Sequence, residues 1–402
     1  MKLTTSNYNL FFIFFSIIWI PLQRFYLHVD GAGRILLLLS IIALFLNFNT
    51  FVNRRELFRS SAFIIWTLLV LFSMFNSFIK GFKAEWGAFE FIRTNFINPL
   101  VFLIIAIIEF NNNKYRCLYT VLAAQIMFLL MGAMHASSLD GERVMAEELG
   151  NSLPLMAAGC SFVVSVLFCE NRLKGGWGTY ILILVFILGI ILLAATRKAL
   201  GAVLIVLIGM VLTRIGKISL RSILTVLLAA IVLFGGVNYI LGHSLIGERI
   251  TASAEIFDVP LVKNEAINKA LMIILGDRAT QYYLGIQLFH EHPVTGIGLT
   301  NFMGITDYGI RLHSEYMVQL CENGIIGFLV LLVFYSVLLK GIKKKRKSGN
   351  NMTIYLFGLL MVLFLNITVW TYNMQIVMVV YALVISQIYS NSIVYENSHP
   401  RA

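Results

Sequence analysis

The sequence predicts an all-α, polytopic integral membrane protein, and three observations support this fold class. Hydrophobic residues make up 59% of the 402 residues, charged residues only 13%, and the mean hydropathy is +0.84. Such a composition excludes a soluble domain of this length, because a water-exposed surface would need many more charged side chains. Apolar runs of about 20 residues, the length that crosses a hydrocarbon core of roughly 30 Å, also recur along the chain. We therefore expect about twelve transmembrane helices and one large outer loop.

Each expected span is an apolar run that ends at polar or charged residues. In chain order the spans are Leu10–Leu22, Ile35–Val52, Phe58–Ile79, Phe91–Phe110, Tyr115–Met134, Asn151–Glu170, Trp177–Thr196, Ala199–Thr213, Ile223–Leu241, Gly324–Leu339, Met352–Trp370 and Met374–Tyr389. The first run has no small-residue cleavage site, so we expect it to stay in the protein as a span. Residues 1–402 then form a single membrane domain.

Lysine and arginine in the short loops predict the orientation, because these residues are retained on the cytoplasmic side. A basic run from Lys340 to Lys347 directly follows the tenth span. Placing this run inside puts the large loop, residues 242–323, outside and leaves both termini cytoplasmic. The net charge of +11 is then explained by cytoplasmic loops beside anionic lipid head groups, and we expect no nucleic-acid partner.

The large outer loop is predicted to contain amphipathic helices on or partly in the membrane surface. Apolar residues recur there at helical spacing, at Ala270, Ile273 and Ile274 and again at Tyr283, Leu284, Ile286 and Leu288. Pro293, Gly296 and Gly298 end the second of these helices. Such a turn either directs backbone N–H groups toward an anion or simply stops the helix.

Several cations lie on the predicted outer side, against the usual charge rule, and they suggest an anionic ligand there. They are Arg143, Arg197, Lys198, Arg249, Lys263, Lys269, Arg278 and Arg311. The alternative is that these cations cap span ends or pair with nearby acids such as Glu142, Glu248 and Asp277.

His313 is the candidate general base, because it lies just before the tenth span, where a lipid-linked head group also lies. Its imidazole has an unperturbed pKa of about 6.5 and can take a proton from a sugar hydroxyl near neutral pH. The plainer interpretation is a histidine satisfied structurally at a helix start. Arg197 in a tight turn and Arg278 in the loop are candidate phosphate ligands, and Tyr282 is a candidate for stacking on a sugar.

We expect neither a metal nor a cofactor. The four cysteines, Cys117, Cys160, Cys169 and Cys321, lie in or beside predicted spans without the close pairs that zinc or a redox dithiol needs. We interpret them as packing residues. The outer segments also contain no acidic pair of the kind that holds a metal in nucleotide-sugar enzymes.

Three segments together resemble the O-antigen ligase and polymerase superfamily of bacterial envelope glycosyltransferases. TRKALGAVL resembles the family's arginine-bearing turn, GDRATQYYLGIQLFHEHPVTGIGLTNF its outer-loop segment, and HSEYMVQLCENGIIG its histidine motif. They occur in the family's order. The loop ERVMAEELGN, with Arg143, also resembles a family segment that precedes a span.

The resemblance implies inverting glycosyl transfer on the periplasmic face of the bacterial inner membrane, from an undecaprenyl diphosphate-linked glycan and without a metal. Arg197 and Arg278 would hold the donor diphosphate, and His313 would activate the acceptor hydroxyl. Arg143, Tyr282 and Glu315 complete the expected substrate-binding set, with Glu315 placed to orient His313. A flippase and a chain-length regulator are further partners expected in the envelope.

The acceptor distinguishes the functions that these motifs allow. A polymerase uses another lipid-linked repeat unit, a ligase uses the lipid A core, and a related ligase glycosylates protein. We favour the polymerase because only a short segment separates Pro293 from His313, whereas ligases of this superfamily often have a longer insertion there. A lipid-linked glycan transporter and a non-catalytic scaffold are the alternatives from other classes, although transporters usually carry ionisable or helix-breaking residues in the middle of spans.

Overall fold

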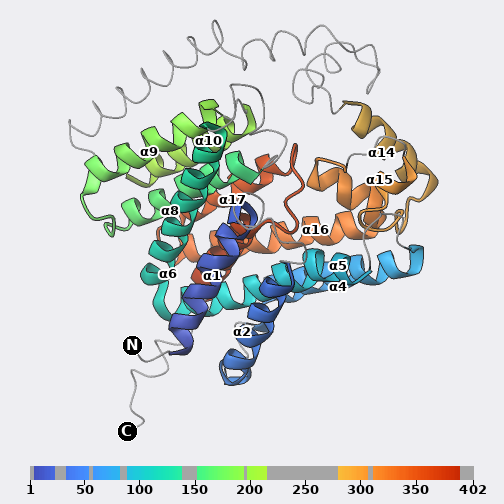
Figure 1. Cartoon of the computed structure of the whole chain (residues 1–402), viewed down its shortest axis with the longest axis horizontal. Coiled ribbons are helices and arrows are strands. Elements are labelled where there is room, and N and C mark those ends of the chain that lie inside the picture. The colour runs from blue at the N-terminus through green and yellow to red at the C-terminus, as the bar shows by residue number, and fades with distance from the viewer. Residues whose placement is uncertain are drawn as a thin grey trace, which may run out of the picture.

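The computed structural model describes residues 4–22, 33–53, 58–81, 88–137, 152–193, 197–214, 279–306 and 311–389. These residues fold into helices and short connections, with no strand among them, so the predicted all-α class is confirmed. Figure 1 shows the helices as one bundle, with α14 and α15 together at one end of it.

The helices vary widely in length. In chain order they are α1 (Thr5–Pro21), α2 (Gly33–Asn53), α4 (Ser61–Lys80), α5 (Ala88–Ile92), the π-helical turn η2 (Arg93–Ile97), α6 (Asn98–Ser137), α8 (Ser152–Cys169), α9 (Gly176–Leu193), α10 (Arg197–Arg214), α14 (Ala279–Glu291), α15 (Phe302–Ile305), α16 (Glu315–Lys347), α17 (Thr353–Leu365) and α18 (Gln375–Tyr389).

Four helical stretches of the described chain are long and apolar enough to cross a membrane by themselves. They are Arg34–Asn53, Ser61–Lys80, Arg93–Met134 and Glu315–Lys347, and shorter apolar helices lie between and after them. The total of about twelve spans stays a prediction. The expected span Ile223–Leu241 lies outside the described residues, as does most of the first half of the large loop.

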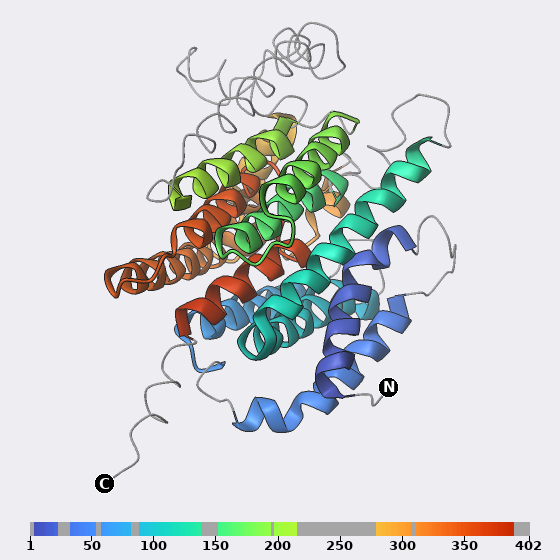
Figure 2. The ribbon, with the colours of Figure 1, turned by 90° about the vertical axis from the view of Figure 1, so that its left-hand side faces the viewer.

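Helix α6 contains one predicted span, Tyr115–Met134, and most of another, Phe91–Phe110. Its backbone leaves helical geometry at Asn113, with φ −141° and ψ 54°, between the predicted spans Phe91–Phe110 and Tyr115–Met134. The two arms diverge from this bend, which Figure 2 shows from the side. A break at this position agrees with the sequence, because Asn111 to Lys114 form a polar interruption.

At two predicted spans, the helix has other ends than the apolar run. The tenth span was expected from Gly324 to Leu339, but α16 begins at Glu315 and continues through the basic run to Lys347. Lysine and arginine are good helix formers, so a helix does not have to stop where it enters water. The eleventh span was expected to reach Trp370, but α17 ends at Leu365.

Close packing between helices holds the bundle together, as lipid-exposed helices require. Helix α10 lies against α17, and a Cβ atom at Gly209 would come within 2.3 Å of the Cβ of Phe357. Glycine at 358 permits a similar approach by Phe162. The four cysteines are free and buried or half-buried, in agreement with a packing role.

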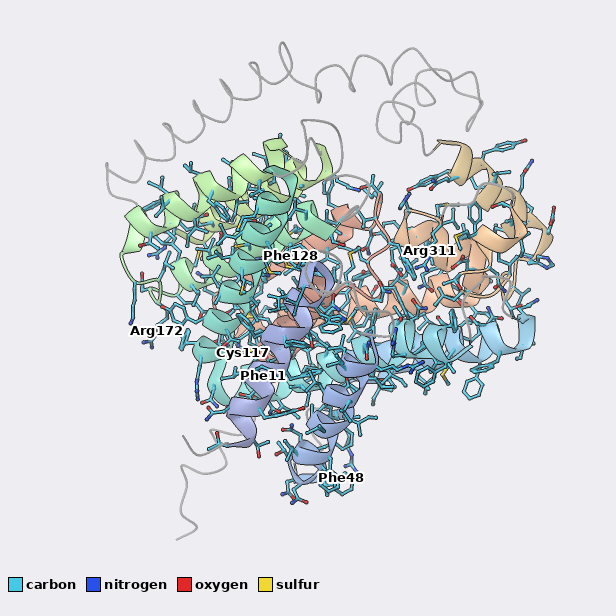
Figure 3. All side chains as sticks on the ribbon, in the orientation of Figure 1. Phe11, Phe48, Cys117, Phe128, Arg172 and Arg311 are labelled. Carbon is cyan, nitrogen blue, oxygen red and sulfur yellow. The ribbon has the colours of Figure 1, made fainter. Side chains whose placement is uncertain are left out.

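A polar contact closes the bundle at the end predicted to be cytoplasmic. The Lys114 ammonium donates to Glu170 Oε1 at 2.6 Å and to the Tyr355 hydroxyl at 2.7 Å. This contact ties the bend of α6 to α8 and α17. Figure 3 shows Arg172, which is close in sequence to Glu170, at the opposite end of the bundle from Arg311.

We expect Gly209→Ala to lower the melting temperature in detergent, because the added methyl group would collide with Phe357 and overpacking is destabilising. Gly189→Ala is the matched control, since Gly189 is exposed in mid-helix and has no atom within 4 Å of an added Cβ. Alanine there should leave the melting temperature unchanged or raise it, because alanine favours helix. Equal shifts in both variants would contradict this packing.

Candidate functional site

The candidate site is built on a break in α16. Gly324 has φ 66° and ψ −167°, a backbone conformation open essentially to glycine alone, and it interrupts the helical hydrogen bonds. The Pro–Gly segment, residues 292–301, fills this break. Ile297 N–H donates to Cys321 O at 3.1 Å, and Gly298 N–H donates to Glu322 O at 2.8 Å. In an unbroken helix these two carbonyls would accept from the N–H groups four residues later.

Those displaced N–H groups find their acceptors in the same segment. Ile325 N–H donates to Pro293 O at 2.9 Å, and Ile326 N–H donates to Val294 O at 3.4 Å. The Pro–Gly segment therefore supplies both the donors and the acceptors that α16 loses at Gly324. A buried break left without partners would be costly.

The approach of the two backbones requires glycine on both sides. A Cβ atom at Gly324 would lie 2.3 Å from Val294 O, and one at Gly296 would lie 2.4 Å from the carbonyl carbon of Glu322. Gly296 also has a φ of 70°. The predicted glycine turn thus stops α14 and pairs with α16, and its N–H groups at 297 and 298 are occupied by protein carbonyls.

The Glu322 side chain fixes the end of the same segment. It is only 3% exposed, and its carboxylate accepts from Thr300 N–H at 2.8 Å and Phe302 N–H at 3.2 Å. These N–H groups lie at the start of α15. Glu322 therefore holds the loop in place, as a helix-capping carboxylate does.

Helix α4 anchors the loop from a third direction. The Asn76 amide donates to Thr295 O at 2.6 Å and Glu322 O at 3.0 Å, and Leu299 N–H donates to the Ser77 hydroxyl at 2.9 Å. Small polar residues on a helix are thus used to recognise backbone. Nothing in the hydropathy of α4 indicates this contact, although Asn and Ser within an apolar span are the available signal.

His313 lies in a non-helical stretch immediately before α16. Ser314 is the N-cap of the helix, with its hydroxyl accepting from Met317 N–H at 3.4 Å and donating to Asn366 O at 3.0 Å. The imidazole of His313 is half-buried. The cap fixes the backbone beside the candidate base, and the break at Gly324 lies about three turns further along the same helix.

Glu315, predicted to bind substrate, is buried in the protein, with only 1% of its surface exposed. Its Oε2 accepts from Thr371 N–H at 2.9 Å and Tyr372 N–H at 2.8 Å, and its Oε1 accepts from the Gln319 amide at 2.9 Å. These contacts tie the start of α16 to the connection between α17 and α18. Both carboxylate oxygens of Glu315 are thus engaged by protein groups.

The connection between α17 and α18, residues 366–374, is the part of the site that sequence analysis missed. The Tyr282 hydroxyl, predicted to lie near a sugar, donates to Ile367 O. The Asn373 amide donates to Asn95 Oδ1 in the π-helical turn at 3.3 Å. The available signal was the polar residues at 366, 368, 371 and 373, which interrupt an apolar run.

The predicted arginine ligands are less completely described. Arg197 is the first residue of α10, at the start of a helix as the tight turn predicted, but its side chain lies outside the described part. Arg278, directly before α14, and Arg143 lie outside the described residues. The meeting of Arg197, Arg278 and His313 around one substrate therefore stays a prediction.

We expect Gly324→Ala to destabilise the protein and to reduce activity, because the new methyl group would overlap Val294 O and push the Pro–Gly segment away. Gly176→Ala is the control, since Gly176 also has a positive φ, 54°, but has open space around it. Positive φ alone costs about 1–2 kcal/mol. A melting temperature that falls equally in both variants would show that the paired backbones add nothing.

Glu315→Ala should lower the melting temperature clearly, because it leaves two buried backbone N–H groups without an acceptor, at about 1–3 kcal/mol each. Glu291→Ala, which removes an exposed carboxylate on α14, should not. A Glu315→Ala protein of normal stability with a raised KM would instead support the substrate-binding role.

Comparison with known families agrees with the motifs. A sequence model described as O-antigen ligase matches residues 182–332, which run from within α9 to within α16 and include Arg197, Arg278 and His313. The matched region also contains the Pro–Gly segment and the break at Gly324. No curated protein matches the chain. The resemblance to the O-antigen ligase and polymerase superfamily is thus confirmed for residues 182–332.

Proposed function

We propose that the chain is a membrane glycosyltransferase that polymerises undecaprenyl diphosphate-linked repeat units into O-antigen or a related surface polysaccharide on the periplasmic face. The observation that carries the proposal is the pairing of the Pro–Gly segment with α16. It joins two of the three family-like motifs into one rigid unit, and His313 lies at the end of that unit. Such rigidity is what a positioned base needs.

In the proposed reaction, His313 accepts the proton of the acceptor hydroxyl as the hydroxyl oxygen attacks the anomeric carbon of the donor sugar. The bond between that carbon and the diphosphate oxygen breaks, and undecaprenyl diphosphate leaves with inversion of configuration. Arg197 and Arg278 offset the charge that develops on the leaving diphosphate, because guanidinium groups match phosphate oxygens in charge and shape.

The short distance along the chain from Pro293 to His313 supports a polymerase. The described part of this stretch is taken up by the Pro–Gly segment from Pro293 on, by α15 and by the non-helical residues before α16. Ligase activity toward the lipid A core is the second candidate, because the matching family is described as O-antigen ligase.

The test is the surface polysaccharide profile of a deletion strain complemented with wild type, His313→Ala or Arg278→Ala at matched membrane abundance. For a polymerase, we expect both variants to leave lipid A core with a single repeat unit, because loss of a positioned base costs about 10²–10⁴ in rate. Unmodified core, with polymer accumulating on its lipid carrier, would identify a ligase.

His290→Ala is the matched control for the histidine variant, since His290 is an exposed residue near the end of α14. It should give the wild-type ladder. A wild-type ladder from His313→Ala as well would contradict the proposed catalytic role.

A further inference from the structure

Arg311 lies on the same side of the chain as His313. The four residues before α16 are not helical, and the last of them, Ser314, is extended, with φ −125° and ψ 128°. Burial alternates along them, with Leu312 and Ser314 each 1% exposed and Arg311 and His313 half-buried. Side chains two residues apart on an extended chain point the same way, roughly 7 Å apart. Both functional groups therefore face the same region.

The guanidinium of Arg311 is held in a defined position. Its central carbon lies 5.2 Å from the centre of the Trp370 ring, in the polar connection between α17 and α18, within the range of a cation–π contact. Burial lowers the pKa of Arg311 to about 10, and the negative charge of Glu322 opposes that shift. Arg311 therefore stays charged near neutral pH. Its guanidinium is attracted to the ring of Trp370 and to the carboxylate of Glu322.

Stacking on the indole engages the face of the guanidinium, whereas its N–H donors lie in the plane at the edge. A half-buried, oriented guanidinium beside a candidate base is suited to an anion on the molecule that the base contacts. That molecule is the acceptor.

We propose that Arg311, held against Trp370, binds a carboxylate or phosphate group of the acceptor glycan next to the hydroxyl that His313 deprotonates. This inference rests on the proposed function and adds an acceptor subsite to it. Arg311 recognises the acceptor, and the leaving diphosphate is assigned to other arginines.

The experiment measures transfer by the full-length chain in lipid nanodiscs, with donor and acceptor varied separately. Arg311→Gln should raise the KM for the acceptor about tenfold or more, as loss of a charge-assisted hydrogen bond does, and leave the KM for the donor nearly unchanged. Arg311→Lys should be intermediate. Trp370→Phe, which keeps a ring under the guanidinium, should stay closer to wild type than Trp370→Leu.

Glucuronate, glucose 6-phosphate and glucose serve as competing probes of the anion. Either acidic sugar should inhibit the wild type more strongly than glucose, and Arg311→Gln should remove that difference. Stronger inhibition by glucuronate identifies a carboxylate subsite, and stronger inhibition by glucose 6-phosphate identifies a phosphate subsite. Equal inhibition by all three sugars, or a change confined to the KM for the donor, would overturn the proposal.

His313→Ala, assayed in parallel, separates the two levels of inference. If it abolishes transfer while a folded Arg311→Gln protein has wild-type KM values, only the acceptor subsite is wrong. If His313→Ala transfers at the wild-type rate, the proposed function and the subsite both fall. Thermal melting of each variant shows whether it is folded.

Discussion

The exchange of backbone hydrogen bonds at Gly324 is the interaction on which the rest of the site depends. A helix that breaks inside a membrane protein exposes carbonyl and N–H groups that lipid cannot satisfy. Here the Pro–Gly segment satisfies them in both directions, through Ile297 and Gly298 as donors and through Pro293 and Val294 as acceptors. The break is therefore a joint between a loop and a helix, and its position fixes where α14, α15 and α16 can lie.

Two buried carboxylates on α16 bind further segments of backbone near this break. Glu322 holds the start of α15, and Glu315 holds the connection between α17 and α18. An isolated buried charge would be strongly unfavourable, but each carboxylate accepts at least two hydrogen bonds from N–H groups. The stretch that carries Arg311 and His313 is thus bounded on one side by the loop and on the other by the connection. Contacts on both sides of this stretch allow the two half-buried side chains to present one defined surface.

The contacts of the polar residues distinguish side chains that support the backbone from side chains that are partly exposed. Glu315 was expected to contact substrate, and its carboxylate accepts from the backbone N–H groups of Thr371 and Tyr372. Tyr282 was expected to stack on a sugar, and its hydroxyl donates to a backbone carbonyl of the same connection. Arg311 was noted only as one of several outer cations, and it lies beside the candidate base. Contacts between helices thus divide the region chosen from charge and position in the chain into supporting and exposed groups.

The sequence by itself determined the helical class, the membrane environment and the order of the motifs, because hydropathy and motif spacing are properties of local stretches. For the same reason, the predicted ends of the spans at α4 and α10 lie close to the observed helix ends. Tertiary structure alone decided that residues 292–301 complete the break in α16, that α17 ends at Leu365, and that Glu315 is buried. These outcomes depend on backbone N–H and C=O groups, which are alike in nearly every residue and carry no sequence signal until the chain brings them together.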